Sequence, residues 1–361
     1  MKKLLTIIGI IAIAAAAFFA LRPARESATD KPIVKIGVAL PLTGNMAELG
    51  QSAKAAILSA FNTANSDTTN NLHYKVILED DQFDPMVMKK IADKFVYQDK
   101  VNVIIDHFSV GAKVYGQVAD QHKIINFHCS FGNAGLLGKY NFQHFLSVDT
   151  EVKSVGDFLE KRNLNDVALV IHNLGSGQEF LGKLEPELKS RNIKFHTETF
   201  NSGERDFNIL IGKIKNKQAT FIFAFSPELD ILTKEIRKQG LFDRQTIVIA
   251  DLMAEKYDVY EGAFSIGAVP TPQNLRKQLN LDGPATYANY MYDIANIVVT
   301  GYEKSFDGTN IPTSDEVSAA IHSQKEWNGT VGEMSLDTSG QFHSAVHEIV
   351  IKNGTPVSVK E

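Results

Sequence analysis

Hydrophobic and polar positions along this chain follow two periods, one typical of strands and one typical of helices. Short continuous runs of β-branched and aromatic residues recur, as expected of strands that are buried on both faces of a sheet. Amphipathic segments lie between them; in 51–65, Ala53, Ile57 and Phe61 fall on one stripe of a helix. The runs that we predict to be strands are 33–40, 72–80, 101–106, 123–129, 167–173, 193–200, 219–225, 245–251 and 263–269.

This alternation predicts an α/β fold with parallel sheets that carry helices on both faces. The pattern runs twice, because four strands lead to residue 150 and a new series begins at Val167. Residues from about 271 to 312 are helical in pattern, and near the end Asn353-Gly354 separates two strand-like runs, a strong signal for a two-residue hairpin. Two lobes, with a chain that crosses between them more than once, fit this order.

The N-terminus differs from the rest of the chain. Two lysines precede an apolar stretch from Leu4 to Leu21, a pattern typical of an export signal and just long enough to span a bilayer. Phe18 lies where a cleavage site favours a small residue, so a cleaved signal and a retained anchor both stay open for residues 1–29. We expect the chain from about residue 30 onward to lie outside the cytoplasm.

Composition excludes several classes of protein. The hydrophobic fraction of 44% and charged fraction of 22% are typical of a globular protein. A net charge of −5 gives no indication of a nucleic-acid partner. The single cysteine, Cys129, excludes an internal disulfide and a lipoprotein anchor, and is expected to be buried. His343 and His347 lie in a strand-like segment without further ligands, so neither a metal nor any other cofactor is expected.

The stretch "GVALPLTGNMAELGQS" (37–52) has the strand, glycine-rich loop and helix layout of a phosphate-binding site. A P-loop needs four residues between its glycines and then a lysine. Here five residues separate Gly44 from Gly50, Gln51 follows, and Glu48 would repel phosphate. We therefore exclude a nucleotide site and interpret the loop as a ligand-binding element at the carboxyl end of a strand.

Residues at two further strand ends are candidates for binding charged groups of a ligand. Ser109 lies where a strand turns into a helix; it is either a helix N-cap or, with the free N–H groups behind it, a receptor for a ligand carboxylate. A serine hydrolase built on Ser109 is an alternative, disfavoured because His107 replaces the first glycine of the nucleophile elbow. Asp251 ends a strand and can pair with a ligand ammonium or cap a surface helix.

Taken together, these segments resemble a known family. "KIGVALPLTGNMAELGQSAKAA" (35–56) resembles the first strand, loop and helix of type 1 periplasmic binding proteins, in the leucine/isoleucine/valine-binding family of ABC transporters. The resemblance covers nearly the whole chain after about residue 33. The other segments that carry it are 77–85, 101–127, 203–215, 221–241 and 327–342.

The resemblance implies a two-lobed Venus-flytrap fold with three hinge crossovers. Lobe 1 would comprise 33–147 and 275–332, and lobe 2 would comprise 148–274 and 333–361. A solute would bind between the lobes and stabilise their closed form. The implied protein is a monomeric, periplasmic or membrane-tethered binding protein that serves an ABC permease, and is not an enzyme. A ligand-sensing domain that serves a separate signalling partner is the alternative within this fold.

The resemblance also implies roles for single residues. Ser109 matches the serine that binds the ligand carboxylate, Asp251 falls near the acidic residue for the α-ammonium, and Ser130 falls where a backbone carbonyl contacts that ammonium. An amino acid is therefore the first ligand expected.

The sequence departs from the family pattern at three positions of the expected pocket. Gly132 stands where a threonine is usual, Gly177 stands near an expected tyrosine, and Phe225 replaces another tyrosine. An aromatic or other small carboxylate is therefore the second ligand expected. The remaining residues expected to line the pocket are Leu49, His107, Phe108 and Phe131.

Overall fold

The computed structural model describes residues 31–132, 137–252, 257–281, 285 and 287–359, and Ile33–Glu361 forms one compact unit. The predicted signal or anchor, residues 1–29, lies outside the described residues. Within the described ranges no helix is both long and apolar enough to cross a membrane.

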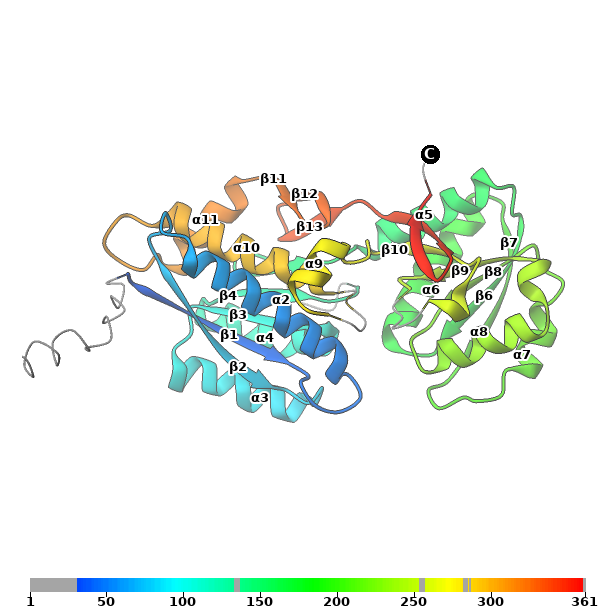
Figure 1. Cartoon of the computed structure of the whole chain (residues 1–361), viewed down its shortest axis with the longest axis horizontal. Helices are drawn as coiled ribbons and strands as arrows, with labels where there is room; N and C mark the ends of the chain where they lie inside the picture. The colour runs from blue at the N-terminus through cyan, green and yellow to red at the C-terminus, as the bar shows by residue number, and fades with distance from the viewer. Residues whose placement is uncertain (1–30, 133–136, 253–256, 282–284, 286, 360–361) are drawn as a thin grey trace, which may run out of the picture. The chain divides into compact units, whose positions relative to one another are not determined.

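The first sheet has eight strands, in the spatial order β11-β12-β13-β5-β4-β3-β1-β2 (Figure 1). The strands β2, β1, β3, β4, β5 and β13 pair in parallel, and β12 and β11 extend the sheet in antiparallel fashion. Its strands are β1 (Ile33–Leu40), β2 (His73–Asp80), β3 (Val103–His107), β4 (Ile125–Cys129), β5 (Asn141–His144), β11 (Glu326–Gly329), β12 (Gly332–Leu336) and β13 (Gln341–Ser344).

The second sheet has seven strands, in the order β15-β14-β10-β9-β8-β6-β7. Its five parallel strands repeat the order of the first sheet, because β7-β6-β8-β9-β10 corresponds to β2-β1-β3-β4-β5. The sequence pattern that runs twice is therefore confirmed as two copies of one topology. Its strands are β6 (Asp166–His172), β7 (Lys194–Phe200), β8 (Ala219–Phe223), β9 (Thr246–Ala250), β10 (Phe264–Gly267), β14 (His347–Lys352) and β15 (Thr355–Ser358).

Helices cover both faces of each sheet, as the buried runs predicted. Successive residues of β1 and β3 enter different apolar clusters: Val38 and Ile105 pack with α2 and α10, whereas Ala39 and Ile104 pack with α3 and α4. The long helices α2 and α10 lie side by side (Figure 1). The helices are α2 (Ala47–Ser66), α3 (Pro85–Asp93), α4 (Phe108–His122), α5 (Val148–Lys161), α6 (Gly175–Ser190), α7 (Asn208–Ile214), α8 (Glu228–Lys238), α9 (Gln273–Gln278), α10 (Ala288–Ser305) and α11 (Ser314–Ser323), with a π-helical turn at Lys94–Asp99 and 3-10 turns at Leu241–Asp243 and Asp258–Tyr260.

All nine predicted strands are present, and the predicted hairpin joins β14 to β15 with Lys352 opposite Thr355. The predicted lobe boundary needs a correction near the C-terminus. Strands β12 and β13 pair within the first sheet, so residues 333–344 do not belong with the second sheet. The chain passes to the second sheet for the last time between β13 and β14.

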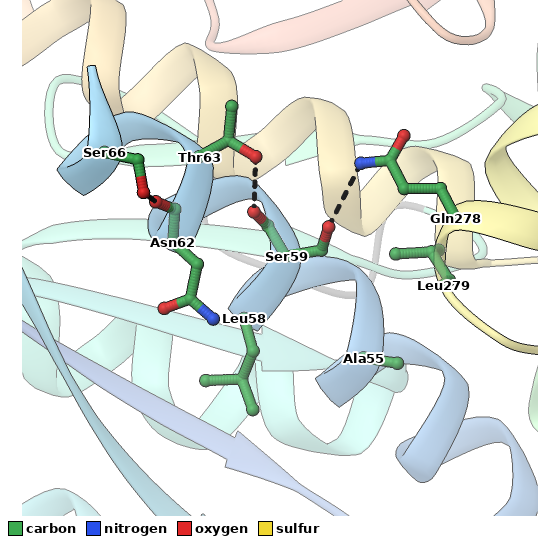
Figure 2. Close-up of a pocket in the computed structure, with 8 residues that line it drawn as sticks. All are labelled: Ala55, Leu58, Ser59, Asn62, Thr63, Ser66, Gln278 and Leu279. Atoms are coloured by element: carbon green, nitrogen blue, oxygen red, sulfur yellow. Dashed lines mark hydrogen bonds between the residues drawn. The ribbon is translucent and has the colours of Figure 1, made fainter.

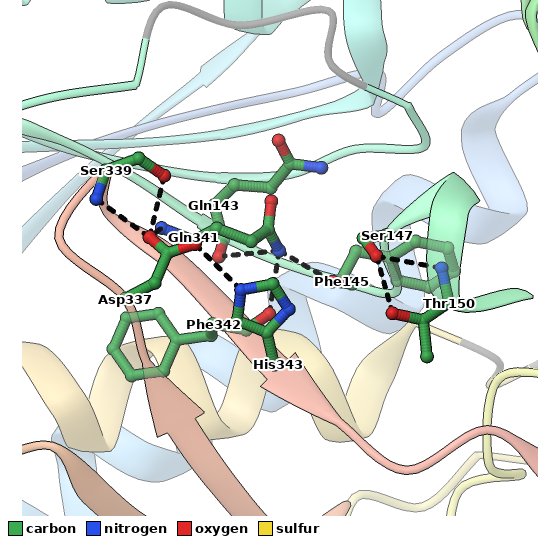
Figure 3. A network of polar contacts seen from close by, with 9 residues as sticks. All are labelled: Gln143, Phe145, Ser147, Thr150, Asp337, Ser339, Gln341, Phe342 and His343. Atoms are coloured by element: carbon green, nitrogen blue, oxygen red, sulfur yellow. Dashed lines mark hydrogen bonds and ion pairs between the residues drawn. The ribbon is translucent and has the colours of Figure 1, made fainter.

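A polar network fixes β13 to the segment that leaves the first sheet after β5 (Figure 3). The side-chain amide of Gln341 donates to the carbonyl oxygen of Phe145 at 3.0 Å, and His343 pairs with Asp337 at 2.8 Å. On the outgoing segment, Ser147 caps α5 by accepting from the N–H of Thr150. The segments that leave the first sheet after β5 and after β13 therefore start side by side, from two neighbouring parallel strands.

Candidate functional site

One cavity of about 640 Å³ collects loops and helix starts from both sheets. From the first sheet's side it is lined by Asn45, Met46, Glu48, Leu49, Phe108, Ser109, Cys129, Phe131 and Tyr287. From the second sheet's side it is lined by Leu174, Ser176, Phe225, Ser226, Pro227, Asp230, Lys234 and Val259.

The topology of the sheets explains why the cavity lies here. In each sheet the first strand has its successor on one side and the third strand on the other, so the chain leaves β1 and β3, and likewise β6 and β8, in opposite directions. Open α/β sheets bind ligands at such switch points, outside the carboxyl ends of the strands. The loops after β1 and β6 and the helices after β3 and β8 all contribute to the cavity.

The start of α4 forms an aromatic wall. Phe108, its first residue, has a φ of 69°, a left-handed conformation that is a genuine outlier for a bulky side chain. Packing holds it in place: its ring stacks on His107 at 3.8 Å and meets the edges of Phe83 at 5.5 Å and Tyr287 at 5.8 Å between centroids. Strained residues that are held in this way concentrate at ligand sites.

Ser109 is the second residue of α4, so of its two predicted roles the helix N-cap is wrong. The cap position belongs to His107, whose side chain accepts no hydrogen bond from the helix. The hydroxyl of Ser109 donates to the carbonyl oxygen of Phe131 at 3.2 Å, longer than the roughly 2.5–3.0 Å usual for an O–H donor. Ser109 therefore lies in the first helical turn, whose N–H groups receive no hydrogen bond from the N-cap side chain.

The start of α6 mirrors the start of α4 on the other side of the cavity. Ser176 is again the second helical residue, and in both helices the described N-cap side chain leaves the first N–H groups without a cap. Neither helix has an acidic residue in its first turn, whereas α2 has Glu48 there and α8 has Glu228 and Asp230. Of the four helices whose residues line the cavity, α2, α4, α6 and α8, the partial positive charge of the N-terminus is thus least compensated at α4 and α6.

Buried side chains form the inner end of the cavity. Cys129, Phe131 and Tyr287 line it and are at most 8% exposed. The prediction that Cys129 is a buried, unpaired residue is confirmed, and burial raises the pKa of its thiol well above the ordinary value. This end is therefore apolar and holds no thiolate.

Two carbonyl groups in the described part of the loop after β4 accept hydrogen bonds from a side chain of β5. The side-chain amide of Gln143 donates to the carbonyl oxygens of Ser130 at 2.9 Å and Gly132 at 2.7 Å. The hydroxyl of Ser130 bonds the ring of His128 at 2.8 Å. Gly132 lies against the carboxylate of Glu179 in α6, where a Cβ would come within 2.5 Å of an oxygen.

Asp251 does not line the cavity. It is 5% exposed, has a φ of 40°, and its carboxyl accepts from the N–H of Ala268 at 2.6 Å. It faces a second buried carboxyl, that of Glu151 in α5. Burial raises the pKa of Asp251 to about 7, and burial and the facing Asp251 raise the pKa of Glu151 well above its ordinary value.

Five of the ten predicted site residues line the cavity: Leu49, Phe108, Ser109, Phe131 and Phe225. The other five lie nearby without lining it: His107, Ser130, Gly132, Gly177 and Asp251. Helix starts signalled in the sequence could have indicated Ser176 and Ser226. No local signal marks Tyr287, Lys234 or Val259, since they reach the cavity only through tertiary packing.

A hydrolase centre at Ser109 has no base in this arrangement. Burial lowers the pKa of His107 to about 3, and within the described residues neither of its ring nitrogens has a hydrogen-bond partner. The Ser109 hydroxyl bonds a backbone carbonyl instead. The described residues also contain no cluster of metal-binding side chains.

A second hollow, of about 530 Å³, follows the side of α2 (Figure 2). Gln278 donates to the hydroxyl of Ser59 across it at 3.2 Å. Its lining has no charged side chain and no helix start, so it offers no means of recognising a charged solute. Its lining residues are Ala55, Leu58, Ser59, Asn62, Thr63, Ser66, Gln278 and Leu279.

Comparison with known proteins gives a consistent answer. A family model described as periplasmic binding protein matches residues 33–353. The Leu/Ile/Val-binding protein homolog 2 of Brucella abortus is 24% identical over 331 residues, which cover 85% of this chain and 87% of that protein.

Two solved structures share the fold at low sequence identity. The branched-chain amino acid transporter substrate-binding protein LivJ of Streptococcus pneumoniae, in complex with isoleucine, aligns with a TM-score of 0.76 at 18% identity, covering 90% of this chain and 97% of that one. A solute-binding protein of an ABC transporter from R. palustris, in complex with benzoate, aligns with a TM-score of 0.77 at 15% identity, covering 91% and 95%.

Proposed function

Because the chain belongs to the type 1 periplasmic binding proteins of the leucine/isoleucine/valine-binding family, we propose that it is the solute-binding component of an ABC importer. Members of this family bind solutes for ABC transporters and are not enzymes. In this proposal residues 1–29 direct export to the periplasm or tether the protein there, and a membrane permease receives the solute.

The proposed ligand is a small carboxylate with an apolar body. The observation that carries this proposal is the pairing of α4 with α6, whose uncapped first turns hold Ser109 and Ser176 at one aromatic cavity. Helix N-termini favour anions, and Phe108, Phe131 and Phe225 supply apolar surface for the body of the ligand. Both α-amino acids and aromatic acids meet this description.

A thermal-shift screen of the purified protein tests the ligand class. A ligand present at 100 times its Kd should stabilise the folded protein by about 2.7 kcal/mol, because it binds only the folded state. Each carboxylate in the panel should be paired with its neutral amide as the control. Amides that raise the melting temperature as much as their acids would contradict recognition of a carboxylate.

Ser109→Ala should weaken binding of the best carboxylate about 10-fold or more. A hydrogen bond to a charged group contributes about 1.5–3 kcal/mol, and each 1.4 kcal/mol is about a factor of ten in Kd. Isothermal titration measures the change. Ser154→Ala is the matched control, since Ser154 is partly exposed on α5 and its hydroxyl donates to the carbonyl of Thr150 in its own helix. Equal Kd values for all three proteins would remove Ser109 from the site.

A further inference from the structure

His107 is a buried histidine without a hydrogen-bond partner. It is fully buried, and within the described residues neither of its ring nitrogens bonds another group. A neutral imidazole has one N–H donor and one acceptor nitrogen, and the large majority of buried polar side-chain atoms are paired. Leaving both nitrogens unpaired is costly, and an apolar residue of similar size would avoid that cost. The position therefore has a hydrogen-bonding capacity that the protein itself leaves unused.

Residues that line the cavity surround this imidazole. Cys129 is its partner on β4 in the register of the sheet, and Tyr287 packs against it with 4.6 Å between ring centroids. Phe108 covers it, with the two rings inclined by only 20°. Because all three of these neighbours line the cavity, His107 lies directly behind the cavity wall.

The left-handed backbone of Phe108 brings the two rings together. Along a regular strand, successive side chains point to opposite faces of the sheet, so residues 107 and 108 could not stack on each other. At a φ of 69° the chain turns, and the Phe108 ring lies over the imidazole instead. This conformation is unfavourable for a bulky residue. The covered state thus combines a strained backbone with an unpaired imidazole.

The side of the Phe108 ring that faces away from His107 meets no buried core. Besides His107 and Tyr287, the ring contacts Phe83, which lies in the loop between β2 and α3 and is 38% exposed. Phe108 itself is only half-buried and lines the cavity. A turn of the ring away from the imidazole therefore leads into the cavity and toward an exposed neighbour.

We propose that His107 is a concealed donor to the ligand's carboxylate and that Phe108 is the gate that covers it. His107 occupies the N-cap position of α4, so it lies at the same uncapped helix start to which the proposed function assigns the carboxylate. When the ligand enters, the Phe108 ring turns aside to lie along the apolar body, and the imidazole donates its N–H to a carboxylate oxygen. This inference rests on the proposed function, because it adds a second donor to the same site.

His107→Leu tests the concealed donor, since leucine fills nearly the same volume without an N–H group. Isothermal titration should show the Kd of the best carboxylate raised about 10-fold or more, because a hydrogen bond to a charged group is lost. The ligand-free variant should melt about 2 °C or more above the parent, because two buried polar atoms without partners are removed. A histidine that only fills space predicts an unchanged Kd, and that result would overturn the inference.

Two further variants separate the lost N–H from altered packing. His107→Gln keeps a side-chain N–H and should bind the carboxylate severalfold more tightly than His107→Leu; equal Kd values for these two variants would overturn the inference. Ile105→Val is the matched control, because Ile105 is fully buried two residues earlier on the same face of β3. It should leave the Kd at the parent's value, and a loss of affinity as large as in His107→Leu would assign the effect to packing of the strand.

Phe108→Gly tests the gate, because glycine adopts the same backbone without strain and leaves the imidazole open to the cavity. Diethylpyrocarbonate acylates accessible neutral imidazoles, and mass spectrometry of the peptide that contains His107 follows the reaction. If the parent opens only into a minor state of at most about 10%, labelling should be about 10-fold or more faster in Phe108→Gly. Equal labelling rates would show that the ring is no cover. Saturating carboxylate should protect His107 in the variant, and a lack of protection would contradict contact with the ligand.

The titrations also separate this inference from the proposed function. A parent protein that binds a carboxylate no more tightly than His107→Leu does would overturn the concealed donor and leave the proposed function standing. A parent protein that binds no carboxylate would overturn both.

Discussion

Gly177→Ala is expected to lower the free energy of unfolding by about 3 kcal/mol, at the upper end of the range for overpacked sites. Gly177 lies in the first turns of α6, where a Cβ would stand 2.2 Å from the carbonyl oxygen of His172 and 3.1 Å from the side chain of Ile171. The obstacle is backbone at the end of β6, which cannot move without shifting the strand. Urea unfolding monitored by circular dichroism measures the loss.

The same helix supplies the control for this prediction. Gly182 also lies in α6, is exposed, and has no atom within 4 Å of the position that an added Cβ would take. Gly182→Ala should therefore be neutral or stabilise the protein by about 0.5–1 kcal/mol, the usual gain in a helix. A Gly177→Ala protein as stable as Gly182→Ala would show that α6 can move away from β6 at no cost.

The first sheet contains the equivalent contact. In α2 a Cβ at Gly50 would lie 2.1 Å from the carbonyl oxygen of Pro41, just after β1. In each half of the molecule a glycine therefore lets the first helix approach the end of the first strand. Both helix starts contribute to the cavity, so these glycines serve the site through packing, a different role from the ligand contact predicted for Gly177.

The fold could be predicted from sequence where the hydrophobic pattern was local and continuous. Strands β1, β3 and β8 are buried on both faces, and their continuous apolar runs predicted both the strands and their parallel arrangement. Strands β5 and β11 were not predicted, because four residues such as "NFQH" and "EWNG" carry neither an apolar run nor a clear alternation. Their place is set by the strands that they pair with. Strand pairing also places β12 and β13 in the first sheet, so the lobe boundary lies after β13.

The candidate site likewise contains residues that local sequence could place and residues that it could not. Ser109 and Phe108 follow β3 directly, so local sequence and the family resemblance were enough to place them at the cavity. Asp251 follows β9 just as directly, but its environment depends on Glu151, which lies 100 positions earlier in the sequence. No local pattern reports that these two carboxyls meet, and their meeting turns a candidate ligand contact into a buried pair.

The buried carboxyl pair should make the stability of the protein depend on pH. The pKa of Asp251 is raised from 3.8 to about 7, and the pKa of Glu151 is raised well above its ordinary value, in both cases chiefly by burial. A carboxyl with a raised pKa contributes stability that is fully present below its unfolded pKa, near 4. That contribution is lost as the pH rises through the folded pKa, because the unfolded chain ionises freely.

The groups that face the pair do not offset this loss. Ala268 offers one backbone N–H to Asp251, while Tyr287, Tyr290 and Cys129 are buried and have raised pKa values, so they stay neutral. Among the described residues no basic side chain contributes to the shifted pKa of either carboxyl. The ionised pair is therefore stabilised by little besides one N–H group.

Glu151→Gln should relieve this dependence. Its amide can donate to an ionised Asp251, so the variant's advantage over the parent in free energy of unfolding should grow by about 2 kcal/mol or more between pH 5 and pH 8. Urea unfolding at both pH values measures the difference, and Asp149→Asn on the same helix should show no such growth. An advantage that stayed constant with pH would mean that the two carboxyls are not buried against each other.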